Sequence, residues 1–227
     1  MRRQASHTAE MVNQLLFGDT VALCSATPGW LLVRTLADNY EGWVQDKQLL
    51  LSDAPVATDC VVPTESAVVC NGMQVTAPAG ASCRQAWLVG ATPQAPTHDI
   101  VATARTFLGA PYLWGGRSKM GIDCSGLAQV VFKICGIALP RDAWQQASAG
   151  TPTTLEQSQP GDLAFFSNPQ GRIIHVGIVS APHGTSIIHA SGRVREDRLD
   201  SNGILDDNNT YTHHLATLRH LLQPANN

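Results

Sequence analysis

The stretch GIDCSGLAQVVFKICG, residues 121–136, decides the fold of the region around it. Its apolar side chains recur every three or four residues, the spacing of one buried helix face; they are Leu127, Val130, Val131 and Ile134. Gly136 ends the pattern, as glycine commonly does just after a helix. The stretch therefore predicts a helix that begins at Cys124.

Cys124 stands at the start of this predicted helix, between Asp123 and Ser125. The unpaired N–H groups and the dipole at a helix N-terminus favour an anion, so a thiolate placed there can have a pKa well below about 8.5. Gly121 and Gly126 allow sharp turns and close approach of a substrate. Two interpretations follow. Cys124 is a nucleophile, or it is a small residue that fills the start of a helix.

A thiolate nucleophile needs a base, and the base needs a group that orients it. Of the eight histidines, His175 and His189 each interrupt an apolar strand pattern, RIIHVGIV and SIIHASG. His213, His214 and His220 fall in a polar tail, where we expect them to be solvated. A single histidine in a strand is usually a half-buried residue without a function, whereas two on strands joined by a tight loop indicate a functional pair.

The two strand histidines are predicted to lie nearly opposite each other. Their numbers average to 182, inside the turn Ala181–Gly184, and paired positions on one face of a hairpin place Cβ atoms about 5 Å apart. Alternation would place on the core face Ile174, Val176, Ile178, Ile188 and Ala190. A slip by one residue would separate the histidines.

The whole chain divides into three predicted domains, at residues 1–52, 53–95 and 96–227. Short β-prone runs with turn residues between them fill the first two; in the first domain they are Thr20–Cys24, Trp30–Thr35 and Tyr40–Gln45. The Pro-rich segment Ala91–Thr97 is the expected linker, and Thr97 the expected N-cap of a helix that follows it. Strands are expected after the central helix, at Asp162–Ser167, Arg172–Ser180 and Thr185–Gly192. This order predicts an α+β domain with helices packed on an antiparallel sheet.

Composition excludes several classes of function. The formal net charge is −3, which gives no electrostatic case for nucleic acid or an anionic membrane, and no apolar run is long enough to span one. The six cysteines form no C-x-x-C pair, which argues against a zinc ribbon or a thioredoxin-like site, and we expect no metal and no cofactor. Because we identify no signal peptide, we expect the thiols to be reduced. The N-terminal residues lack the apolar core of a signal peptide, so the expected location is the cytoplasm; a leader missing from this sequence would make it periplasmic or secreted.

The motifs PYLWGG, DCSG, LPRD, PGDLAFF, HVGIV and IIHASG, in this order, resemble the NlpC-type cell-wall cysteine peptidases, which have a papain-like fold. FGD, GWLLVRT and YEGWV resemble bacterial SH3-like domains, so one or two small all-β barrels should precede the catalytic domain. The resemblance implies Cys124 as nucleophile, His175 as general base and His189 as the residue that orients it. It also implies that Tyr112 contributes to the oxyanion hole with the N–H of Cys124.

The combination of domains is similar to the γ-D-glutamyl-L-diamino acid endopeptidases of murein-peptide recycling. These cut the γ-D-Glu–diaminopimelate bond of peptides with a free N-terminal L-Ala. The resemblance implies that Asp123 and Ser125 line the site with Tyr112, and that Glu10 and Tyr40 hold the L-Ala ammonium. The family often has a serine after PRD, where this chain has Ala143, so one possible hydrogen bond to substrate is lost.

Three alternatives stay open at this point. The protein could be a secreted wall hydrolase anchored by its SH3-like domains. It could be a non-catalytic module that binds wall peptides. It could also be an acyltransferase or amidase on the same scaffold, because a thiol acyl-enzyme can pass its acyl group to amines as well as to water.

Overall fold

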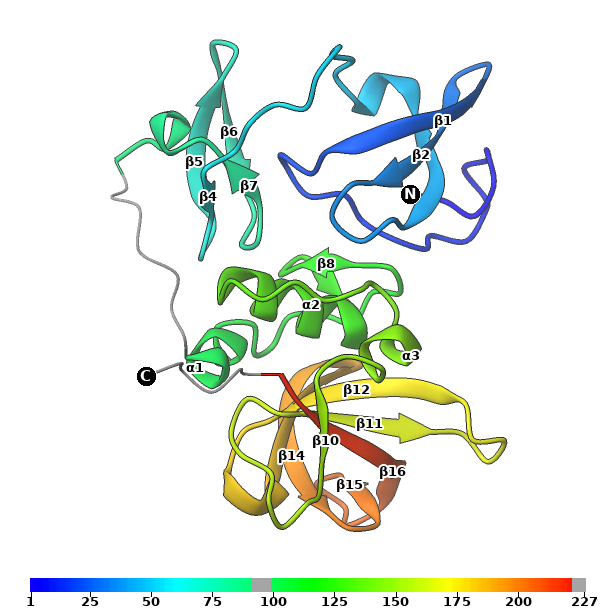
Figure 1. The fold of residues 1–227 in the computed structure, drawn as a ribbon, viewed down its shortest axis with the longest axis vertical. Helices are drawn as coiled ribbons and strands as arrows, with labels where there is room; N and C mark the ends of the chain where they lie inside the picture. Colours follow the sequence, from blue (N-terminus) through cyan, green and yellow to red (C-terminus); the bar gives the residue numbers. More distant parts are fainter. Residues whose placement is uncertain (91–98, 222–227) are drawn as a thin grey trace.

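The computed structural model describes residues 1–90 and 99–221, so the expected linker at 91–97 and the expected N-cap Thr97 lie outside the described residues. Its layers are visible in Figure 1: two small β units at the top, a layer of short helices in the middle and a larger sheet below. Among the described residues, no helix has the length and apolar character needed to cross a membrane.

The first β unit is a three-stranded antiparallel sheet in chain order, β1 (Val21–Thr27), β2 (Trp30–Thr35) and β3 (Glu41–Gln45). All three overlap the strands expected from sequence. Gly29 and Asn39 make the turns with positive φ values of 77° and 58°, a conformation that these two residue types adopt at little cost. A short 3₁₀ helix, η1 (Asp46–Gln48), follows the sheet.

The second β unit consists of two separate ladders rather than one closed barrel. β4 (Cys60–Val61) pairs with β7 (Ser82–Cys83), and β5 (Ser66–Cys70) pairs with β6 (Met73–Ala77). The 3₁₀ helix η2 (Gln85–Trp87) comes next. The small core of the second β unit contains Val62, Val68, Ala77, Ala81 and Cys83. So few buried side chains leave this unit dependent on its neighbours.

The helical layer begins at α1 (Ile100–Arg105), whose N-cap is Asp99, with its carboxylate accepting from the N–H of Ala102 at 2.8 Å. The short hairpin β8 (Arg117–Ser118) and β9 (Gly121–Ile122) leads into α2 (Cys124–Ile134). This helix starts at the predicted residue, and its predicted apolar face is buried. The four-residue helix α3 (Ala143–Gln146) completes the layer.

The third region is dominated by one antiparallel sheet, in the order β10-β16-β11-β12-β13-β14-β15. The strands not yet introduced are β10 (Thr151–Thr153), β11 (Leu163–Ser167), β12 (Ile173–Val179), β13 (Ser186–Ser191), β14 (Arg193–Asp200), β15 (Gly203–Leu205) and β16 (Tyr211–His220). β15 also pairs with β16, so six strands close into a barrel. The prediction of helices packed on an antiparallel sheet is therefore only partly right, because strands predominate and the sheet closes on itself.

Closure gives this sheet two buried faces. One face packs with α1 and α2 in the main core, which includes Val176, Ile178, Ile188 and Ala190 as predicted. The other face lines the barrel interior with Ala164, Phe166, Val179, Ile187 and Ile204. The prediction for Ile174 is wrong, because its side chain is 54% exposed near the start of β12.

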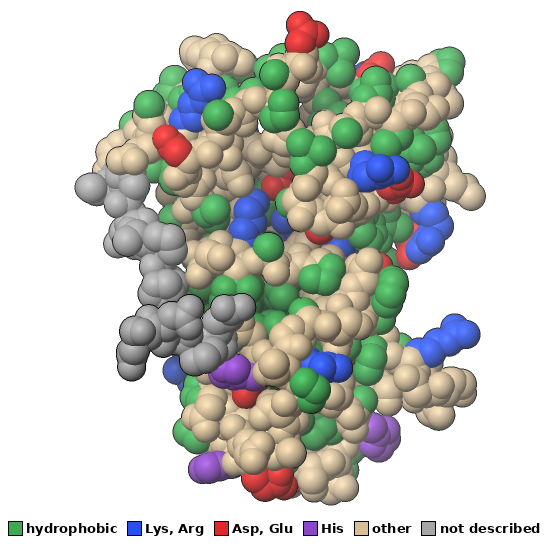
Figure 2. All heavy atoms as spheres, in the orientation of Figure 1, with side chains coloured by type: hydrophobic (Ala, Val, Ile, Leu, Met, Phe, Trp, Pro, Cys, Tyr) green, Lys and Arg blue, Asp and Glu red, His purple; other side chains and the backbone are tan. Residues whose placement is uncertain are grey.

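The N-terminal unit docks on the helical layer through buried polar contacts. Arg117 and Lys133 both reach the carboxylate of Asp19, at 2.7 and 3.2 Å, and the Asp19 side chain is 9% exposed. These contacts fix the first β unit against α2. Charged side chains on the face drawn in Figure 2 are scattered and of both signs, in keeping with the small net charge.

Candidate active site

Cys124 is the first residue of α2 and is 7% exposed. The Asp123 carboxylate caps this helix by accepting from the N–H of Gly126 at 2.6 Å. Gly126 is required here because a Cβ at this position would lie 2.3 Å from the carbonyl oxygen of Gly116. The sharp entry into the helix therefore depends on two glycines that pack backbone against backbone.

Burial controls the protonation of the Cys124 thiol and raises its pKa to about 12. The negative charge of Asp123 acts in the same direction, whereas backbone hydrogen bonds from Val176 and Ser125 lower the pKa. The helix N-terminus thus acts in the expected direction but is outweighed. The predicted low pKa is wrong for the site without substrate, where Cys124 is a neutral thiol. The hydrogen bond from Val176 also places the sulfur next to β12, at the residue that follows His175 in the chain.

His175 and His189 face each other across adjacent strands, with His175 Nε2 2.9 Å from His189 Nδ1. The register differs from the prediction, since His189 pairs with Gly177 and not with His175. An offset of two residues keeps both histidines on the same face, so their contact is diagonal. The hairpin is centred on His183, which adopts a left-handed conformation with φ of 57° in the 3₁₀ turn η3 (Pro182–Gly184).

Asp197 on β14 continues this chain of contacts and was missed from sequence. Its carboxylate lies 2.9 Å from His189 Nε2, and Arg195 holds its other oxygen at 2.7 Å. These two partners lower the pKa of Asp197 despite its burial. An ionised carboxylate can only accept, so His189 carries its proton on Nε2 and accepts at Nδ1 from His175 Nε2–H. His175 Nδ1 is then left with a lone pair.

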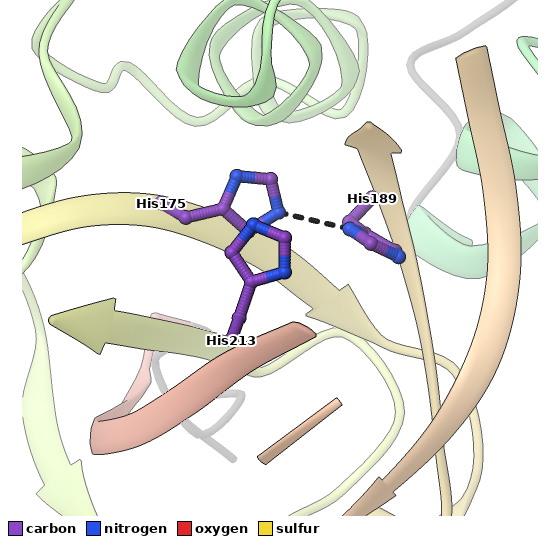
Figure 3. A group of neighbouring side chains, drawn as sticks. All are labelled: His175, His189 and His213. Atoms are coloured by element: carbon purple, nitrogen blue, oxygen red, sulfur yellow. Dashed lines mark hydrogen bonds between the residues drawn. The ribbon is translucent and has the colours of Figure 1, made fainter. Parts of the chain in front are cut away.

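The free nitrogen of His175 is drawn in Figure 3 on the side of the helix above the three rings. Burial and the neighbouring imidazoles hold the pKa of His175 well below its usual value of 6.5, so its ring is neutral. A neutral imidazole with a lone pair on Nδ1 can accept the proton of a neutral thiol that approaches it. The contacts from Asp197 through His189 hold His175 in the tautomer that a general base requires, and its role toward Cys124 stays a prediction.

His213 on β16 is part of the same cluster, which corrects the expectation of a solvated residue. Its ring stacks on that of His175, with centroids 4.1 Å apart and an angle of 24° between the planes (Figure 3). Burial, with His189 nearby, lowers the pKa of His213 to about 4. Sequence spacing could not show this contact, because it arises from closure of the barrel.

Burial is the main cause that raises the pKa of Tyr112 to about 12. Cys124 and Asp123, which lie nearby, raise the pKa of Tyr112 further in the same direction. The phenol is therefore protonated and able to donate a hydrogen bond. Its backbone is fixed by a bond from its N–H to the carbonyl of Gly192 at 2.9 Å. The oxyanion role that the resemblance implies for Tyr112 stays a prediction.

Asp123 and Ser125 are tied to Arg141, a residue that sequence analysis did not single out. Arg141 is 2% exposed and contacts Asp123 Oδ2 at 2.5 Å and Ser125 Oγ at 2.8 Å. The two Asp123 oxygens also accept from the N–H groups of Gly115 and Gly126. The structure thus gives Asp123 the role of helix cap and ion-pair partner, and its contact with substrate stays a prediction.

Glu10 and Tyr40 of the first β unit both contact residues of the helical layer and the loops that lead into it. Glu10 accepts from Trp114 Nε1–H at 2.8 Å and pairs with Arg3 at 2.5 Å. Tyr40 is half-buried and interacts with Asp142, and its pKa is raised to about 12 mainly by burial. Asp142, whose own pKa is raised by burial, is a further carboxylate that sequence analysis missed. Ala143 follows it as the first residue of α3.

Comparison with known proteins gives two family matches within the chain. The model of the NlpC/P60 family matches residues 109–215. The bacterial dipeptidyl-peptidase Sh3 domain matches residues 1–49. Both matches agree with the resemblance drawn from sequence motifs.

Curated relatives are similar over part of their length. The gamma-D-glutamyl-L-lysine dipeptidyl-peptidase of Bacillus subtilis is 49% identical over 82 residues, which are 35% of this chain and 28% of that protein. Its namesake from Bacillus cereus is 41% identical over 80 residues, 35% of this chain and 24% of that protein. The matches thus span about a quarter of these relatives.

Among solved structures, a crystal structure of an NlpC/P60 family protein from Bacillus cereus superposes with a TM-score of 0.76. The superposition covers 93% of this chain and 82% of the Bacillus cereus chain, and the two sequences are 23% identical. At this identity, the similarity shows the fold.

Proposed function

Because the chain carries an NlpC/P60 domain joined to a bacterial dipeptidyl-peptidase Sh3 domain, we propose that it is a cysteine endopeptidase acting on murein peptides. The proposed bond is that between γ-D-Glu and diaminopimelate, in peptides with a free N-terminal L-Ala. The names of the two Bacillus relatives support a γ-D-glutamyl–diamino acid bond as the target. One observation carries the proposal. Hydrogen bonds connect Asp197 to His189 and His189 to His175, and the residue after His175, Val176, donates a backbone hydrogen bond to Cys124.

The proposed reaction proceeds through a thioester. His175 Nδ1 accepts the proton of Cys124 as the sulfur attacks the γ-carbonyl carbon of D-Glu, and the C=O electrons move to oxygen. Tyr112 and the Cys124 N–H would stabilise this oxyanion. The C–N bond then breaks, and the amine leaves with the proton held by His175. Water repeats the sequence on the thioester, releases the free γ-carboxylate and restores the thiol.

Selection of a free N-terminus would depend on the carboxylates contributed around the first β unit. Glu10 is paired with Arg3, whose charge also acts on Tyr40 and Asp142, so these groups lie close together. A substrate ammonium can replace the Arg3 guanidinium on Glu10, because both are cations of equal charge. The Arg3–Glu10 pair is exposed and therefore weak, which makes this exchange inexpensive.

Two peptides test the proposal: L-Ala-γ-D-Glu-diaminopimelate and its N-acetyl derivative. We expect cleavage of the first, loss of cleavage in Cys124→Ala with binding retained, and greatly weakened cleavage of the acetylated peptide. Glu10→Gln should raise KM for the free-amine peptide more than for the acetylated one. Turnover by Cys124→Ala contradicts the mechanism. Equal digestion of intact cross-linked wall supports instead the wall-hydrolase alternative.

A cytoplasmic location goes with this proposal, because free stem peptides small enough for such a site are products of earlier wall degradation. Fractionation of cells that produce the protein, with activity followed on the free-amine peptide, tests it. Recovery of the activity in the periplasmic or secreted fraction contradicts it.

A further inference from the structure

We propose that His175, His189 and His213 form an inhibitory binding site for a first-row divalent transition-metal ion, with Zn²⁺ as the best fit. One nitrogen from each ring lies within 4.8 Å of the nitrogens of the other two. The three rings project from different strands, β12, β13 and β16, toward a common point (Figure 3). This site differs from the expectation of no metal, which was drawn from the cysteines; the three histidines are far apart along the chain.

The donor set fits zinc in number and type. Three imidazole nitrogens and one open position are a common zinc arrangement, with Zn–N bonds of about 2.0–2.1 Å. Tetrahedral geometry then needs donor nitrogens about 3.3 Å apart. The pair His175 Nε2 and His189 Nδ1 is already at 2.9 Å. Small ring movements at His175 and His189 therefore suffice for two of the three ligands.

Asp197 supports the metal site as it supports the catalytic arrangement. It accepts from His189 Nε2–H, which leaves Nδ1 as the nitrogen that can bind a metal. A carboxylate behind a histidine ligand orients the ring and makes the ligand more basic. Arg195 in turn holds Asp197 in place.

The third ligand is the one that must move most. His213 Nδ1 lies 2.9 Å from the Thr212 hydroxyl, which can accept a hydrogen bond from Nδ1–H, so that Nε2 carries the lone pair. The ring is half-buried rather than fully enclosed, so it can turn out of its stack on His175 to aim this lone pair at the ion.

Metal binding would prevent His175 from acting as a general base, because it changes the tautomer of the His175 ring. In the working tautomer, His175 carries its proton on Nε2 and has a lone pair on Nδ1. To bind a metal at Nε2, the proton moves to Nδ1, with no net proton gained or lost. Nδ1 can then no longer accept the proton of Cys124. This inhibitory consequence rests on the proposed function, whereas the binding of metal does not.

The binding test uses the Cys124→Ala protein freed of metal by a chelator, so that no thiolate at the site can hold the ion and activity plays no part. Titration with Co²⁺ should give the visible absorption of a low-coordinate cobalt–imidazole site at one ion per chain, and Zn²⁺ should displace it. The same affinity is expected in the wild-type chain. Loss of the signal in Cys124→Ala overturns the proposal, because the metal would then be held by the sulfur.

Two neighbouring histidines of β16 provide a matched pair of variants. His213→Phe keeps a planar ring for the stack but removes the ligand, so Co²⁺ and Zn²⁺ affinity should fall by about tenfold or more. His214→Phe alters the next residue, whose side chain points to the opposite face of the strand, and should leave affinity unchanged. Equal metal affinity in His213→Phe and the parent protein overturns the site. Circular dichroism confirms that both variants are folded.

Discussion

His189 lies between His175 and Asp197, with 2.9 Å to each, so that one imidazole transmits the orientation set by a carboxylate on β14 to the base on β12. The direction of both hydrogen bonds follows from the charge of Asp197. Because the Asp197 carboxylate only accepts, His189 donates to it from Nε2–H, and His175 in turn donates to His189 Nδ1. The tautomer of His175 is therefore determined by a residue that is separated from it by another side chain.

Asp197→Asn should lower kcat with little change in KM. The amide of asparagine can donate to His189 Nε2, which reverses both hydrogen bonds and leaves His175 Nδ1 with a proton in place of a lone pair. We expect a loss of roughly 100-fold or more in kcat, measured on the free-amine peptide.

Asp207→Asn is the control for Asp197→Asn, because Asp207 is an exposed carboxylate that also contacts Arg195, at 3.0 Å, without reaching His189. It should retain nearly full activity. An equal loss in both variants, or a loss in Asp197→Asn that is confined to KM, contradicts the positioning role.

The reaction of Cys124 with iodoacetamide should accelerate with pH throughout the range from 6 to 10. Because burial raises its pKa to about 12, the fraction of thiolate increases by about tenfold for each pH unit below that value. A thiolate–imidazolium pair would instead react at a constant rate between about pH 6 and 8, while the imidazole stays protonated. Peptide mapping by mass spectrometry separates Cys124 from the exposed Cys24, and circular dichroism verifies folding at each pH. A plateau between pH 6 and 8 contradicts the neutral pair.

Arg141→Gln should destabilise the protein by about 3–5 kcal/mol, because it leaves the Asp123 carboxylate buried without its ion-pair partner. Urea unfolding measures this loss. Arg34→Gln removes an exposed pair with Glu41 and should change the stability much less, because water and salt screen an exposed ion pair. The double variant Asp123→Asn/Arg141→Gln should recover part of the stability, because no buried charge remains. Similar losses for Arg141→Gln and Arg34→Gln contradict a buried ion pair that stabilises the helix start.

The parts of the fold that were predicted from sequence depend on local patterns. The helix at Cys124 follows from a repeat within eleven residues, and the strands β1–β3 follow from short runs between turn residues. The hairpin register was wrong by two residues, because His183 adopts a left-handed conformation and moves the centre of the turn. Alternation was enough to keep His175 and His189 on one face.

The parts of the site that were missed depend on contacts between distant segments. Asp197 reaches His189 because β14 pairs with β13, and His213 reaches His175 because β16 lies between β11 and β15 in the closed barrel. Closure of a barrel leaves no periodic signal in sequence. Arg141 meets Asp123 through the packing of α3 beside α2. The low pKa expected for Cys124 was wrong because burial, a property of the folded chain, outweighs the helix N-terminus.

Oxidation should join Cys60 and Cys83 in the second β unit. They are direct partners across β4 and β7, and their sulfur atoms are 3.3 Å apart, against about 2.05 Å in a disulfide. Cys83 is buried and its pKa is raised to about 12, so exchange with a small disulfide should begin at the half-buried Cys60. Two thiols and one small disulfide then give one protein disulfide and two small thiols.

This disulfide would close the loop from β4 to β7, which contains the turn at Gly80 that packs on Val130 of α2. A bond across a loop of this length should stabilise the protein by roughly 3 kcal/mol, seen as a rise in Tm after treatment with oxidised glutathione and as a new cross-linked peptide in a non-reducing digest. Cys60→Ser should abolish both effects, whereas Cys70→Ser should abolish neither. The second β unit has only a small core, so we expect its unfolding to limit the stability of the whole chain. An unchanged Tm after complete cross-linking would contradict this expectation.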